Sequence, residues 1–175
     1  MPDLRYPIGK FANPGSLTDA RRRECIDEVA AAPGALRQAV NGLTEAQLET
    51  PYRPDGWTVR QVVHHLPDSH VNAYVRFKLA LTEDQPAIKT YEEKRWAELS
   101  EARTAPIELS LALLEALHRR WVLVLRALSP ADFGRTLMHP ENGVMSLDAM
   151  LALYSWHGRH HVAHITALRE RMGWS

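Results

Sequence analysis

The apolar residues of this chain recur with a period close to 3.6 over long stretches, and this pattern constrains the fold more than any other feature. Two stripes are especially clear: Val59, Val62, Val63, Leu66, Ala73, Phe77 and Leu81, then Ile107, Leu111, Leu114, Leu117, Trp121, Val124 and Leu128. Such spacing places apolar side chains on one face of an α-helix. Two further helices are expected, one ending at Gly42 and one between Ser146 and Gly173. Because each must bury its apolar face, the pattern predicts an all-α four-helix bundle.

Short elements are expected between these long helices. Residues 44–47 and 58–61 have the Thr-x-x-Gln pattern of a capping box, which opens a helix. Ser129 followed by Pro130 favours a helical turn, and a short helix is expected within 91–99. The Asn-Gly pair at 142–143, between short β-compatible runs, favours one small β-hairpin.

Prolines mark the remaining features of the backbone. Three of them fall in residues 1–15, which are therefore expected to form an extended N-terminal arm. Pro33 and Pro67 lie inside two helical patterns, where a proline removes a backbone hydrogen bond, so a kink or restart is expected at Pro33 and a bend at Pro67. No repeat or low-complexity tract divides the chain, and residues 1–175 are expected to form a single domain.

Charge and composition exclude several classes of function. Lys and Arg number 21 and Asp and Glu 21, so no basic excess favours binding to nucleic acid. No apolar run approaches the ~20 residues of a membrane span, and the first residues lack the apolar core of a signal peptide. A cytoplasmic protein without a membrane partner is therefore expected. Cys25 is the one cysteine, which excludes an internal disulfide, and we interpret it as a small structural residue.

Histidine is unusually concentrated in two places. Of nine histidines, seven form two clusters: His64, His65 and His70, then His157, His160, His161 and His164. At 100° per residue, His157, His161 and His164 lie within about 60° of arc on the apolar face of the last helix. His160 lies to one side of that line. Histidine therefore takes positions where leucine would otherwise face the core.

The first cluster can approach the second inside a bundle. His65 follows Val62 by three residues and points toward the interior, whereas His64 is turned away by 100°. An inward histidine from one helix and an i,i+4 pair from another form a common metal chelate. Three imidazoles with an open fourth position are typical of a catalytic divalent site. The alternative is a set of core histidines with separate hydrogen-bond partners, although each unsatisfied ring would cost roughly 1–3 kcal/mol.

These residues resemble a known family along almost the whole chain. The segments that carry the resemblance are WTVRQVVHHLPDSH at 57–70, YSWHGRHHVAHI at 154–165, PYRPDGW at 51–57, RFKLALTE at 76–83 and LLEALHRRW at 113–121. They are similar to the YfiT group of the DinB-like superfamily. The resemblance implies a four-helix bundle that forms a homodimer and binds one divalent metal per subunit, zinc or nickel. The positions that match its ligands are His65, His157 and His161.

The resemblance implies the reaction less specifically than the metal. The group is described as metal-dependent hydrolases, while related proteins transfer thiols such as bacillithiol, mycothiol or glutathione, and isomerases also occur. A divalent metal would hold a thiol as thiolate or lower the pKa of water toward ~7. Hydrolysis also calls for a general base, and Asp68, one turn after His65, is the candidate. Asp68 could equally orient a histidine ring, or be a polar residue beside the bend at Pro67.

We therefore expect first a metal-dependent thiol S-transferase that joins a low-molecular-weight thiol of the bacillithiol class to small electrophiles. A metal-dependent hydrolase of a small-molecule substrate is the alternative, and a non-catalytic metal-binding dimer is the second alternative. The chain contains no H-E-x-x-H sequence, which excludes a zincin-type protease.

Other residues near the clusters receive weaker assignments. His164, Tyr154, His64 and His160 are candidates to line the pocket or to support the ligands, with core packing as the alternative for His164 and Tyr154. Ordinary surface or capping positions are expected for three other histidines: His70, His118 and His139. Two arginines are expected to be solvated rather than to bind an anionic thiol: Arg60 and Arg159.

Overall fold

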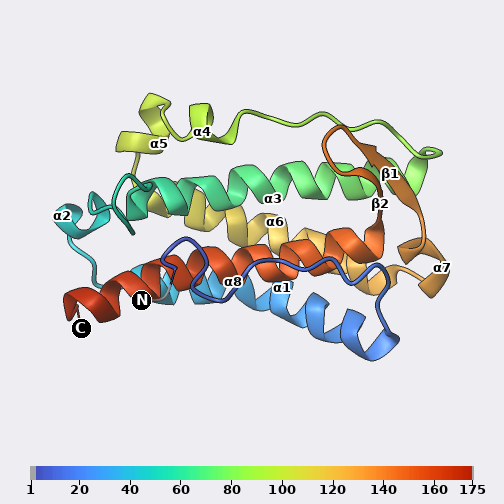
Figure 1. Ribbon diagram of the computed structural model, residues 1–175, viewed down its shortest axis with the longest axis horizontal. Helices are drawn as coiled ribbons and strands as arrows, with labels where there is room; N and C mark the ends of the chain where they lie inside the picture. Colours follow the sequence, from blue (N-terminus) through green and yellow to red (C-terminus); the bar gives the residue numbers. More distant parts are fainter. Residues whose placement is uncertain (1–2, 175) are drawn as a thin grey trace.

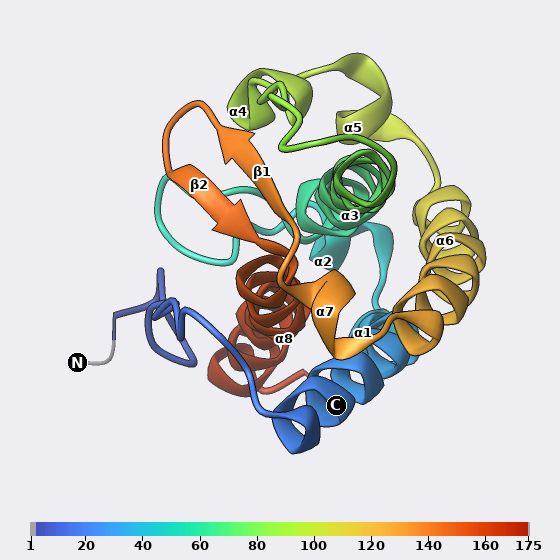
Figure 2. The same ribbon diagram turned by 90° about the vertical axis from the view of Figure 1, so that its right-hand side faces the viewer.

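The computed structural model describes residues 3–174 and contains the predicted four-helix bundle (Figure 1). Its long helices are α1 (Asp19–Val40), α3 (Val59–Thr82), α6 (Ile107–Ala127) and α8 (Leu147–Met172). Viewed along the bundle, they follow one another around the core in the order α1, α6, α3, α8 (Figure 2). Consecutive long helices α1 and α3 are therefore diagonal partners, while α3 and α8 are neighbours although residues 83–146 separate them in the sequence.

The shorter elements lie at the ends and along one side of the bundle. They are α2 (Glu45–Leu48), α4 (Glu93–Trp96), α5 (Ser100–Thr104), α7 (Pro130–Phe133), β1 (Thr136–His139) and β2 (Gly143–Ser146). The antiparallel hairpin pairs Thr136 with Ser146, which confirms the expectation from the Asn-Gly pair. The short helix expected within 91–99 is α4, and α5 follows it just outside that range. No helix among residues 3–174 is both long and apolar enough to cross a membrane.

Helix starts follow the predicted caps. Thr44 and Thr58 both form complete capping boxes, in which the threonine side chain and the glutamine three residues later each accept a backbone N–H. Ser146 caps α8 by accepting from the backbone N–H of Ala149. Thr18 caps α1 by accepting from the backbone N–H of Arg21. These starts depend on neighbouring residues alone, so the sequence pattern is sufficient to locate them.

Both prolines lie inside continuous helices. α1 runs through Pro33 without a restart, and α3 runs through Pro67. Because Pro33 has no N–H, the carbonyl of Val29 four residues earlier loses its helical donor. A side chain replaces that donor: His118 Nδ1 lies 2.6 Å from the Val29 oxygen. A side chain from another helix thus supplies the Val29 carbonyl with the hydrogen-bond donor that the proline lacks.

The N-terminal arm lies along α8 (Figure 1). Its residues 3–9 fold into two successive turns, and the remainder leads without regular structure to α1. The backbone N–H of Leu17 donates to Asp148, and Phe11 packs against Trp156 with ring centroids 5.9 Å apart. The arm therefore brings residues from the start of the chain to the histidine-rich helix.

The core consists of two apolar clusters, one toward each end of the bundle. The cluster at the hairpin end surrounds Phe77 and Trp121 and includes buried Cys25, while the other surrounds Leu36 and Ile165. On three of the long helices, buried or half-buried histidines lie in the turns between the two clusters: His70 on α3, His118 on α6, and His157, His160, His161 and His164 on α8. The polar site is thus an internal layer enclosed by apolar packing above and below.

We expect Phe77→Ala to lower the free energy of unfolding by about 3–5 kcal/mol, because Phe77 is fully buried and its loss leaves a cavity. The control is Leu123→Ala on α6, where the side chain is 72% exposed and the expected change is within about 0.5 kcal/mol. Urea unfolding of metal-free protein measures both. Equal effects at the two positions would contradict this assignment of the core.

Candidate metal centre

Three histidines from two neighbouring helices converge inside the bundle. His65 on α3 and His157 and His161 on α8 each offer a ring nitrogen, and these atoms all lie within 4.8 Å of one another. The Nε2 atoms of His65 and His157 are 3.4 Å apart. Two nitrogens bound to a tetrahedral zinc ion at about 2.0–2.1 Å would be separated by roughly that distance. The structure therefore brings together the three positions that the sequence selected.

The local environment favours neutral imidazoles, the form that binds metals. Burial lowers the pKa of His65 to about 4, and burial lowers the pKa values of His157 and His161 well below the usual range. The buried Nδ1 of His161 has no hydrogen-bond partner among residues 3–174. Three neutral imidazoles, of which His161 has a ring nitrogen without a hydrogen-bond partner among the described residues, fit a divalent transition metal.

A cavity of about 690 Å³ adjoins the three histidines. Its walls carry the aromatic side chains of Tyr6, Tyr52, Trp57 and Trp156 and the charged side chains of Arg5, Arg53, Asp55, Lys94, Glu93 and Glu98. This volume is typical of a pocket for a small molecule. The sequence analysis missed Arg5 and Arg53, because only the folded arm and the loop before α3 bring them beside α8.

Two further histidines of α8 line the same cavity. His164 Nε2 donates to the carbonyl of Arg5 at 3.1 Å, and its ring stacks on Tyr52 with centroids 4.0 Å apart. His160 stacks on Trp156 with centroids 4.2 Å apart. Both therefore lie in the pocket, and His164 also ties the N-terminal arm to α8.

His64 and Tyr154 lie away from the cavity. The ring of His64 is hydrogen-bonded at both ends: Nε2 donates to the Ala105 carbonyl at 3.1 Å, so Nδ1 accepts from the Ser110 hydroxyl at 2.7 Å. Neither nitrogen is free for a metal. Tyr154 is buried, with its ring 5.7 Å from that of His157 and 5.6 Å from that of Trp121. Its contacts fit the packing alternative.

Asp68 is not among the residues that line the cavity. Its carboxyl is half-buried, and burial, followed by the charge of Glu101 on α5, raises its pKa to about 6. The side chain therefore shares its surroundings with the α5 segment, and this placement favours the interpretation of Asp68 as a polar residue beside Pro67.

Ordinary surface or capping positions were expected for His70, His118 and His139. None of the three is at the surface. His70 is 0% and His118 1% exposed, and both lie deep in the bundle. Their spacing carried a signal, because His70 follows Leu66 by four residues and His118 precedes Trp121 by three, each on an apolar stripe. His139 is 9% exposed and its Nδ1 accepts backbone N–H groups of the hairpin turn.

The expected solvation of Arg60 is also wrong. Arg60 is 4% exposed, pairs with Glu45 and with Glu49 at 2.6 Å, and donates to the Ala105 carbonyl at 2.8 Å. It connects α2, α3 and the segment that follows α5. Arg159 is exposed as expected and lies 3.6 Å from Glu28.

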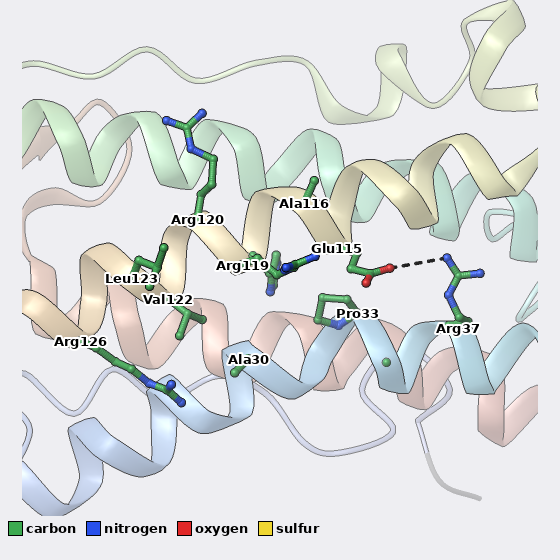
Figure 3. A pocket seen from close by; sticks show the side chains of 12 residues that line it. Ala30, Pro33, Arg37, Glu115, Ala116, Arg119, Arg120, Val122, Leu123 and Arg126 are labelled. Carbon is green, nitrogen blue, oxygen red and sulfur yellow. Dashed lines mark ion pairs between the residues drawn. The ribbon is translucent and has the colours of Figure 1, made fainter.

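A larger hollow, of about 970 Å³, lies between α1 and α6 (Figure 3). Four arginines and Glu115 line it, with Arg37 and Glu115 3.9 Å apart, and His118 contributes to its wall. Within residues 3–174, however, the only group of three potential metal ligands is the histidine set beside the smaller cavity. Chemistry rather than size therefore identifies the candidate site.

The fold and the site define a class of four-helix bundle proteins with an internal three-histidine cluster beside a cavity. The sequence pattern of the DinB superfamily matches residues 28–165, and the chain belongs to that superfamily. Over 174 residues it is 53% identical to a protein of Bacillus mycoides (strain KBAB4) and 52% identical to one of Bacillus cereus (strain 03BB102). Each match covers 99% of this chain and 100% of the relative, and both relatives bear the name "putative metal-dependent hydrolase".

A solved structure has the same fold. YfiT from Bacillus subtilis superposes with a TM-score of 0.96 at 50% identity, over 98% of this chain and 99% of that chain. It is described as a probable metal-dependent hydrolase with an unusual four-helix bundle topology. This match confirms the resemblance to the YfiT group and the predicted fold class. The diagonal placement of α1 and α3 is the feature of this chain that departs from a simple up-and-down bundle.

Proposed function

We propose that this chain is a divalent-metal enzyme whose ligands are His65, His157 and His161. The observation that carries the proposal is the convergence of three ring nitrogens within 4.8 Å beside a cavity large enough for a small molecule. The names of the relatives support metal dependence. Zinc and nickel both accept three imidazoles, and either is compatible with this ligand set.

The site provides three protein ligands and leaves room for a nucleophile. A divalent metal bound there would supply the charge that keeps a thiol or a water molecule deprotonated near neutral pH. The histidine rings hold their nitrogens in place through burial between two apolar clusters. The aromatic walls of the cavity exclude bulk water from one side of a bound substrate and offer it apolar contact.

The nucleophile that fits best is a low-molecular-weight thiol of the bacillithiol class. No carboxylate oxygen among residues 3–174 joins the histidine group, and Asp68, the base expected for hydrolysis, does not line the cavity. Thiol transfer needs no such base. Arg5, Arg53 and Lys94 on the cavity wall suit the carboxylates of such a thiol. The thiolate sulfur would bond to an electrophilic carbon as the leaving group departs.

Hydrolysis is the second candidate, favoured by the names of the relatives and by Glu93 and Glu98, which line the cavity and could act as bases. The proposal also includes a cytoplasmic location and a homodimer. Sedimentation of a particle of 19.8 kDa, one chain's mass, at micromolar protein would contradict the dimer.

Conjugation of monochlorobimane tests the proposed reaction. We expect zinc- or nickel-loaded protein to conjugate it with bacillithiol but not with glutathione, and protein stripped of metal or carrying His161→Ala to be inactive. His160→Ala, which alters the same wall but leaves the three ligands intact, is the control for metal retention. Metal-dependent cleavage of nitrophenyl esters without any thiol would instead support the hydrolase. No turnover by protein that holds one metal per chain would contradict both.

A further inference from the structure

A series of hydrogen bonds between three imidazoles, those of half-buried His157 and of fully buried His70 and His118, leads from the candidate metal centre across the bundle. His157 Nδ1 lies 3.0 Å from His70 Nε2, and His70 Nδ1 lies 2.7 Å from His118 Nε2. His118 Nδ1 lies 2.6 Å from the carbonyl oxygen of Val29. These residues belong to α8, α3, α6 and α1, so the hydrogen bonds connect all four long helices.

The Val29 carbonyl, where this series of hydrogen bonds ends, determines which atom donates in each of them. A carbonyl oxygen only accepts hydrogen bonds, so His118 Nδ1 donates to Val29. A neutral imidazole has one donor and one acceptor nitrogen, and His118 Nε2 must therefore accept from His70 Nδ1. By the same rule, His70 Nε2 accepts from His157 Nδ1. His157 is left with an unprotonated Nε2, the atom that lies 3.4 Å from His65 Nε2.

The Val29 carbonyl is available because of Pro33. In an uninterrupted α-helix the residue at position 33 would donate its N–H to this oxygen, and proline cannot. The rings are also enclosed: His70 and His118 are both almost fully buried, which disfavours their charged forms. The series of hydrogen bonds therefore starts at the carbonyl that Pro33 leaves free in α1 and ends at the unprotonated Nε2 of His157 in the candidate metal centre.

We propose that His70 and His118 are positioning residues, which hold His157 in the Nδ1–H tautomer and aim its free Nε2 at the metal. The inference rests on the proposed ligand set. Metal-bound histidines usually donate their other N–H to a fixed acceptor, and loss of such a partner typically weakens metal binding by about 10–100-fold. Here the acceptor is itself an imidazole, whose tautomer is set by a third ring and a backbone carbonyl.

The first test uses the unaltered, metal-free protein. Long-range ¹⁵N–¹H NMR of the imidazoles at pH 8 distinguishes the two tautomers. We expect His118, His70 and His157 to carry the proton on Nδ1, and His64, which donates from Nε2 to Ala105, to provide the opposite tautomer in the same spectrum. A proton on Nε2 of either His70 or His157 would overturn the proposal.

The second test compares His118→Leu with His64→Leu. Each change replaces a buried histidine with an apolar residue, but only the first removes the acceptor of His70. In H118L we expect the ring proton of His70 to lie on Nε2, from which His70 donates a hydrogen bond to His157 Nδ1. His157 Nδ1 must then be unprotonated, so the ring proton of His157 lies on its own Nε2. Zinc affinity, measured by competition with a chromophoric chelator, should fall by about 10–100-fold in H118L and stay at the wild-type value in H64L.

The outcomes separate this proposal from the proposed function. Wild-type affinity and an unchanged His157 tautomer in H118L would overturn the positioning role. If H118L fails to fold, the tautomers of the unaltered protein decide the question. A wild-type chain that binds no zinc or nickel would instead defeat the proposed ligand set, whatever the tautomers are.

Discussion

Alanine at His65, His157 or His161 will abolish stoichiometric binding of zinc or nickel, while alanine at His160 will leave one metal per chain. Each of the three substitutions removes one of the three ligands that we propose for the site. The loss of affinity should exceed the roughly 10–100-fold that follows when only a supporting partner is lost. Metal content after gel filtration and isothermal titration with ZnCl₂ measure the effect.

His160 is the matched control because it is adjacent to His161 on α8 and lines the same cavity, yet its ring stacks on Trp156. His64→Ala provides a second control on α3, since both nitrogens of His64 have protein partners. If His160→Ala strips the metal and His161→Ala retains it, the assignment of ligands on α8 is wrong. Circular dichroism of each variant separates loss of a ligand from loss of the fold.

Metal-free protein will lose stability steeply as the pH falls from 6.5 toward 5. Burial lowers the pKa values of His65 and His118 to about 4, whereas histidines of the unfolded chain titrate near 6.5. Between these values the unfolded chain binds protons that the native state does not, so the free energy of unfolding decreases with decreasing pH. At pH 5 these two residues together account for about 4 kcal/mol, a large part of the stability of an ordinary domain.

Other buried histidines change the size of this effect but not its sign. Burial lowers the pKa values of His70, His157 and His161 well below the usual range, which adds to the loss in acid. Asp68 acts in the opposite direction, since its raised pKa of about 6 makes the native state bind a proton more readily than the unfolded chain. It is a single group, and several histidines outweigh it.

Urea unfolding in EDTA at pH 5, 6, 7 and 8 measures this dependence. We expect the free energy of unfolding to be nearly constant above pH 7 and to decrease below 6.5. H118L, compared with its own value at pH 8, should lose about 2 kcal/mol less by pH 5 than the unaltered chain, because one suppressed titration is gone. Equal stability at pH 5.5 and 7.5 would show that these imidazoles are not held neutral by burial.

Helical periodicity directs four histidines inward, at positions 65, 157, 161 and 164, and the resemblance to the YfiT group selects three of them, His65, His157 and His161, as candidate ligands. His157 and His161 are four residues apart on an apolar stripe, and His65 interrupts a second stripe, so any bundle that buries both stripes directs these rings inward. The helix caps, the hairpin turn and the long helices α3 and α6 likewise depend on residues that are close together in the sequence. For these features, neighbouring residues contain the necessary information.

Asp68, His70 and Arg60 show where local reasoning was insufficient. Asp68 is one turn from His65, but its surroundings depend on the path of the α5 segment, which no periodicity predicts. His70 is on an apolar stripe, but its hydrogen-bond partners are His118 and His157, which belong to other helices. Arg60 is buried because α2 folds back and places Glu45 and Glu49 beside it.

The sequence by itself determined that the chain forms four amphipathic helices with inward histidines, because helix formation and burial of an apolar face depend on residues within a few turns. Only the tertiary structure decided which histidines meet. α3 and α8 are adjacent because α1 and α3 are diagonal, and that order follows from the packing of whole helices. The same packing places His118 against the carbonyl that Pro33 leaves free, a contact between residues 89 positions apart that no local pattern could reveal.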